Sequence, residues 1–310
     1  MYKQLMSLLL VFVLIFSYPF AAFAQANSQN SDDIEKINKL IENGATQVEA
    51  TRWLKIEKIT KQMETSGQVV EQIDGKVQII DPPNMRNGIS NDDKEYLIEA
   101  VKKQLKSKKV TLQEKLSDLK KLEKQNPGRS KYRIDYGDGN WTEFRLTRSR
   151  RDLIAQDVTK TCFDNTPVPN EIEYGTAYTF PSDDQYYESM GMTESCYLGS
   201  ATNILMWTYT VSNSGKHVSV NSATNAVDTS GIIQVSSFAK YINVSDTDYY
   251  EQPSLWCEAE SQAIYNITGG IGATLTGPLS ITVPYGRTWT QYVVFRASLV
   301  QEHIYFGYHV

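Results

Sequence analysis

The spacing of apolar residues changes at Asn126-Pro127-Gly128, and this change constrains the fold more than any other feature of the chain. Before the break, apolar residues recur every three or four positions, which places them on one face of a helix. After it, short segments alternate apolar and polar residues, the period of a β-strand. The sequence therefore predicts an α+β protein by region: residues 25–129 form a helical region with a short β-hairpin, and residues 130–310 an all-β antiparallel sandwich.

Within the helical region we expect three helices and one hairpin. One helix, bent near Gly44, is expected over 32–63, and a second includes 97–105. Thr111 and Glu114 have the spacing of a capping box and predict the start of a third. Asp74-Gly75 lies between two short β-branched runs, which indicates a hairpin with a two-residue turn.

Beyond the break, alternation predicts a hairpin over 132–146 that turns at Gly137-Asp138-Gly139-Asn140. Further strands are expected at short intervals. They cover residues 174–180, 198–211, 217–220, 232–238, 273–275, 279–283, 288–295 and 304–308.

The first 24 residues have the three parts of a secretory signal peptide. Lys3 precedes an apolar run over 5–16, and small residues around Phe23 predict cleavage after Ala24. The apolar run is shorter than the roughly 20 residues that cross a bilayer, and no later segment is apolar for long enough. We therefore expect a secreted protein, without excluding the periplasm, whose mature chain does not span a membrane.

Charge and aromatic content also divide the chain. Residues 25–129 hold 19 Lys and Arg against 17 Asp and Glu, whereas 160–310 hold 5 against 14. The same second segment contains 14 of the 19 tyrosines. A net acidic, tyrosine-rich surface disfavours nucleic acid as a partner.

The three cysteines, Cys162, Cys196 and Cys257, permit one intramolecular disulfide with one thiol left over. Export to an oxidising compartment favours such a bond, and we predict it between Cys196 and Cys257. Three unpaired thiols remain the alternative. Neither a Cys-x-x-Cys motif nor a pair of histidines at helical spacing is present, so no metal site is predicted.

Catalytic motifs are weak. A cysteine peptidase similar to the papain-like enzymes would use Cys196 as nucleophile and His303 as base, but Tyr197-Leu198 replaces the expected Gly-Pro and little chain remains after His303 to orient it. No phosphate-binding glycine loop, nucleophile elbow or metalloprotease helix occurs. We predict no catalytic residue and no cofactor, and keep a secreted hydrolase as an alternative function.

Aromatic residues favour a binding function. Tyr249, Tyr250 and Trp289 are candidates for an exposed row that stacks on sugar rings, although most aromatics of a sandwich fill its core. The expected partner is a polysaccharide or a cell-surface component. A further alternative is a pore-forming β-toxin, in which the Ser/Thr-rich stretch 218–237 inserts into a membrane; its alternation is irregular over 225–231.

The signal peptide, the Tyr136-Gly137-Asp138-Gly139-Asn140-Trp141 hairpin and the Ser/Thr/Tyr-rich strands after it resemble the uncharacterised exported proteins of Bacillus-type bacteria. The resemblance covers about the last 180 residues and transfers no active site. Together these features predict a secreted, non-catalytic binding or interaction protein.

Overall fold

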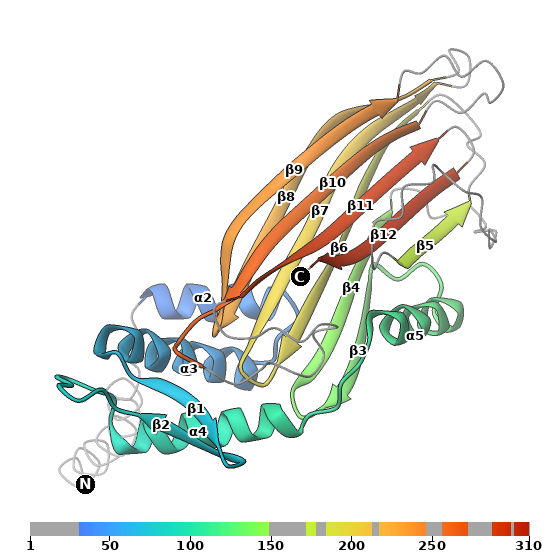
Figure 1. Ribbon diagram of the computed structural model, residues 1–310. Helices are drawn as coiled ribbons and strands as arrows, with labels where there is room; N and C mark the ends of the chain where they lie inside the picture. The colour runs from blue at the N-terminus through green and yellow to red at the C-terminus, as the bar shows by residue number, and fades with distance from the viewer. Residues whose placement is uncertain are drawn as a thin grey trace, which may run out of the picture.

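In the part of the chain that the structure describes, four helices lie at one end of a long two-sheet β-sandwich (Figure 1). The computed structural model describes residues 31–148, 172–177, 184–212, 217–245, 256–271, 287–298 and 301–309. The predicted α+β division is confirmed: the helices precede residue 126, and antiparallel strands follow it. The predicted signal peptide and its cleavage after Ala24 lie outside the described residues.

The described helices are α2 (Ser31–Glu42), α3 (Gln47–Ser66), α4 (Asn91–Lys106) and α5 (Leu112–Gln125). The capping box of Thr111 and Glu114 at the start of α5 is confirmed. The prediction of one bent helix over 32–63 is wrong. Gly44, with φ 101°, ends the first helix, and Thr46 caps a second one through a capping box with Glu49.

The hairpin of β1 (Val69–Ile73) and β2 (Lys76–Ile80) is also confirmed. Asp74 and Gly75 both have positive φ, as a type I′ turn requires.

Two five-stranded sheets form the sandwich. One runs β3 (Lys131–Gly137), β4 (Asn140–Arg148), β6 (Asp184–Cys196), β7 (Gly199–Ser212) and β8 (His217–Gly231). The other runs β5 (Ile172–Ala177), β12 (Gln301–His309), β11 (Thr288–Ser298), β10 (Trp256–Ile267) and β9 (Ile233–Ser245). Consequently β8 and β9 are the edge strands on the same side of the sandwich (Figure 1).

The chain crosses from one sheet to the other at Gly231-Ile232. The backbone N–H of Ile232 donates to the carbonyl of Leu198, and Ile232 accepts in turn from the N–H of Thr268. Gly231 has φ 63°, and a Cβ there would lie 1.8 Å from the Leu198 carbonyl oxygen. Only glycine fits this crossing, which fixes where β8 ends and β9 begins.

Large aromatic side chains fill the space between the sheets. Trp207 and Tyr209 of β7 stack on each other at 4.8 Å between ring centroids, and Phe295 of β11 meets Trp207 edge to face at 4.4 Å. The same apolar cluster continues into the helical region through Met63, Leu97 and other buried residues. Helices α3, α4 and α5 therefore share one core with the sandwich.

Polar contacts attach the helices to the turn between β6 and β7. The indole N–H of Trp53 donates to the Cys196 carbonyl at 3.0 Å, and Arg52 Nε to the Tyr197 carbonyl at 3.1 Å. The Tyr197 N–H donates to Gln104 Oε1 at 2.7 Å. Three backbone groups of one turn are thus satisfied by side chains of α3 and α4, as buried polar groups require.

A buried ion pair makes a further connection. Lys115 of α5 donates to Glu194 of β6, and neither side chain is exposed to solvent. Desolvation lowers the pKa of Lys115, and the Glu194 carboxylate opposes this shift. Gln291 also approaches Glu194, at 3.5 Å. Removal of one partner would leave an uncompensated charge inside the protein.

We expect Lys115→Met to lower the free energy of unfolding by about 3–5 kcal/mol, because Glu194 then stays buried without its cation. The double variant Lys115→Met/Glu194→Leu should lie much closer to the wild type. Lys120→Met, at an exposed position of the same helix, is the matched control. Chemical denaturation measures all three, and a Lys115→Met protein as stable as the control would contradict the prediction.

Candidate functional site

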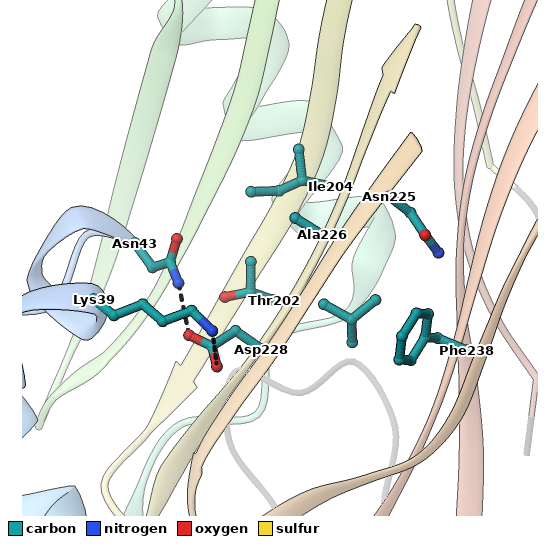
Figure 2. Close-up of a pocket in the computed structure, with 9 residues that line it drawn as sticks. Lys39, Asn43, Thr202, Ile204, Asn225, Ala226, Asp228 and Phe238 are labelled. Carbon is teal, nitrogen blue, oxygen red and sulfur yellow. Dashed lines mark hydrogen bonds and ion pairs between the residues drawn. The ribbon is translucent and has the colours of Figure 1, made fainter. Parts of the chain in front are cut away.

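A hollow of about 300 Å³ lies where α2 meets the edge strand β8 (Figure 2). Its lining comes from α2 and the residue after it, from β7, from β8 and from β9. The lining residues are Lys39, Asn43, Thr202, Ile204, Asn225, Ala226, Val227, Asp228 and Phe238.

The polar side of the hollow is built around Asp228. Lys39 Nζ lies 3.2 Å from its Oδ1, and Asn43 Nδ2 donates to its Oδ2 at 2.9 Å (Figure 2). Each carboxylate oxygen has a second lone pair, and the Lys39 ammonium has further N–H donors. A ligand hydroxyl here could donate to Asp228 and accept from Lys39.

Helix α2 is held in position by its apolar face. Ile37 and Leu40 are buried in a small cluster with Trp53 and Trp141, whose rings lie 6.4 Å apart. From this helix Lys39 meets Asp228 of β8, and Lys36, almost one turn earlier, meets Glu57 of α3.

The apolar side ends in Phe238, which is 60% exposed. β9 contains one extra residue, Ser236, since Val235 pairs with Tyr265 and Ser237 with Ile264. This β-bulge turns Phe238 to the same side of the sheet as Val235, toward β8. The ring stays exposed because β9 is an edge strand. An exposed aromatic ring thus lies across β8 from the Asp228 cluster (Figure 2).

Two contacts join β8 to β9 just beyond the hollow. Lys240 Nζ donates to the Ala223 carbonyl at 2.7 Å, and Asn225 Nδ2 to the Ala239 carbonyl at 3.1 Å. These side chains bond backbone carbonyls at the facing edges of β8 and β9. They therefore connect the two edge strands at this end of the hollow.

A second hollow, of about 380 Å³, follows the same two strands toward their turn. Val227 lines the first hollow, and Thr229, two residues further along the same face of β8, lines the second. Its lining is Lys36, Glu57, Lys61, Thr229, Gly231, Ile233, Gln234 and Val235. We call the two hollows together the β8–β9 groove.

The predicted disulfide between Cys196 and Cys257 is wrong, since Cys196 is a free thiol. Cys196 lies beside Leu198, whose carbonyl bonds Ile232 at the helical end of the sandwich. Cys257 lies ten positions along β10 from Ile267, the partner of Ile233, which is about 33 Å of strand. A disulfide needs Cα atoms within about 7 Å. Cys162 lies outside the described residues.

The structure does not bring Cys196 and His303 together. His303 pairs with Arg296, which pairs with Glu258, so its backbone lies at the Cys257 end of the sheet. Burial raises the pKa of the Cys196 thiol to about 11, against weaker opposing hydrogen bonds from the backbone of Leu198 and Gly199. A thiol that stays protonated and lies far from the histidine lacks what a nucleophile requires.

Trp289 was predicted as an exposed binding aromatic, and this is wrong: it is 1% exposed and packs on Tyr265 at 5.3 Å between centroids. Tyr249 and Tyr250 lie outside the described residues.

The stretch 218–237 forms most of β8 and the start of β9, which pair with β7 and β10 respectively. In the described ladders β8 and β9 do not pair with each other, so the pore-forming alternative stays a prediction.

No family model, no curated protein and no solved structure matches this chain. The resemblance to exported Bacillus-type proteins stays a prediction as well.

Among the described helices, none combines the length and apolar character that a bilayer crossing needs. Within the same described ranges, no group of three or more His, Cys, Asp or Glu side chains could hold a metal ion.

At pH 8 we expect Cys196 to resist iodoacetamide in the native protein. With a pKa of about 11, roughly one thiol in a thousand is ionised at that pH, against about a quarter for an ordinary cysteine. Peptide mapping by mass spectrometry, with and without guanidinium chloride, measures the modification. Alkylation of Cys196 as fast in the native protein as in denaturant would contradict its burial.

Proposed function

We propose that this protein is an exported, non-catalytic binding protein that holds a saccharide in the β8–β9 groove. The observation that carries the proposal is the position of the exposed Phe238 ring across β8 from the Asp228 cluster. Binding sites of this kind combine an apolar surface with a few placed polar groups.

Sugar chemistry fits both sides of the groove. The C–H groups on one face of a pyranose ring are apolar and pack against an aromatic ring such as Phe238. The hydroxyls of the same sugar both donate and accept hydrogen bonds, which suits the acceptor Asp228 beside the donors Lys39 and Asn43. The apolar side chains of Ile204 and Ala226 add contact on the same face as Asp228 (Figure 2).

A binding role also agrees with the chemistry of the described residues. The Cys196 thiol is buried, and its raised pKa keeps it protonated at neutral pH. The groove carboxylates, Asp228 and Glu57, are each engaged by a lysine, which favours a fixed hydrogen-bonding role over proton transfer. Binding without chemical conversion therefore needs no group beyond those that line the groove.

Phe238→Ala should weaken saccharide binding about tenfold, because it removes the stacking surface, worth about 1.4 kcal/mol. The matched control is Tyr241→Ala: Tyr241 lies three residues further along β9, is 44% exposed and points to the opposite face of the sheet. Retention of residues 25–310 on cell walls and insoluble polysaccharides identifies the ligand, and calorimetry with its oligosaccharides gives the affinities.

Asp228→Asn should weaken the same binding by about tenfold or more, because it removes a charged acceptor from two donors and from the sugar hydroxyls. Circular dichroism checks that each variant is folded. Equal losses for Phe238→Ala and Tyr241→Ala, or no retention of the wild-type protein on any polysaccharide, would overturn the proposal.

A further inference from the structure

The second hollow contains a positively charged site that the first lacks. Lys36 of α2 reaches both oxygens of Glu57, at 2.7 and 2.6 Å, and Lys61 of α3 reaches one of them at 2.8 Å. Two ammonium groups thus surround one carboxylate. Burial raises the pKa of Glu57, but the hydrogen bonds and charges of the two lysines outweigh it, so the pKa is lowered and the carboxylate stays ionised.

Both ammonium groups have donors left over. An ammonium carries three N–H donors, and Lys61 uses one of them on Glu57. The Lys61 side chain is 60% exposed and that of Lys36 is 35% exposed, whereas Glu57 is 10% exposed. The solvent side of this hollow therefore presents cations, with the carboxylate behind them.

Counted over the whole groove, three lysines meet two carboxylates, which leaves one net positive charge. The complete chain, in contrast, has a formal net charge of −5. A site with a net positive charge favours the approach of a negative group.

The two hollows have the length of a chain-like ligand. From Ile233 to Phe238 the strand β9 extends about 15 Å. The apolar ring lies at one end of this path and the two lysines at the other. A ligand that uses both ends is longer than one sugar ring and carries its negative charge at a distance from the ring that stacks on Phe238.

We infer that the ligand of the β8–β9 groove is an acidic oligosaccharide, whose neutral ring stacks on Phe238 while a carboxylate or phosphate further along the chain binds Lys36 and Lys61. This inference rests on the proposed saccharide-binding function and adds the ligand's charge and minimum length. The two lysines hold Glu57 and the ligand anion at once, so that neither charge is left uncompensated in the hollow.

The test uses one series of oligosaccharides of two to six units, each in a neutral form and in a form oxidised at C6 to uronic acids. The wild-type protein should bind the longer oxidised chains at least about fivefold more tightly than their neutral counterparts. This advantage should shrink as salt is raised from 50 to 500 mM, because screening weakens the ion pair. The shortest chains should show no advantage.

Lys61→Gln should weaken the binding of oxidised chains more than that of neutral chains, and so remove most of the advantage of the oxidised chains. Lys58→Gln is the matched control, because Lys58 is also on α3, is 58% exposed and pairs with Asp33 outside the groove. Equal binding of neutral and oxidised chains by the wild type, or equal losses for both forms in Lys61→Gln, would overturn the inference and leave saccharide binding intact. Failure to bind either form would overturn the proposed function itself.

Discussion

The attachment of three helices to one end of the β-sandwich determines the rest of the structure. Trp53 and Arg52 of α3 and Gln104 of α4 bond the backbone of Cys196 and Tyr197, while Lys115 of α5 meets Glu194 on the strand before the turn. A wrong register of β6 would leave all of these groups buried without partners. We therefore expect the sandwich to reach its native packing together with the helices.

The groove follows from this attachment. Helix α2 packs on Trp53 and Trp141, so its position depends on the same interface, and it places Lys39 and Asn43 against Asp228, 185 or more residues later in the sequence. Gly231 fixes the crossing between the sheets, and the bulge at Ser236 directs Phe238 toward β8. Neither the helical region nor the sandwich contains the groove alone, so the proposed binding site requires both parts of the chain.

The sequence predicts those parts of the fold that depend on local chemistry: the turn at Asp74-Gly75, the cap at Thr111 and the strand period after residue 128. It fails where nonlocal packing decides. In β6 two of the inward-facing residues are charged, Glu188 and Glu194. In β10 the inward-facing residues include the small side chains Ala259, Ser261 and Ala263. Neither strand therefore shows a clear alternation of apolar and polar residues, and the sequence predicts neither of them. Trp289 was misassigned because sequence does not distinguish a core aromatic from an exposed one. Phe238 lay within a predicted strand, but only the sheet order reveals its exposure.

We expect the helices and the sandwich to unfold as one cooperative unit, because the turn between β6 and β7 joins them. Thermal unfolding of residues 25–310, followed at once by circular dichroism at 222 nm and by tryptophan fluorescence, tests it most directly. The helices dominate the circular dichroism at 222 nm. The buried tryptophans of the shared core and of the interface between helices and sandwich dominate the fluorescence. Coincident transitions are expected. A helical signal lost in a separate, earlier transition, with the tryptophan environment retained, would contradict the claim.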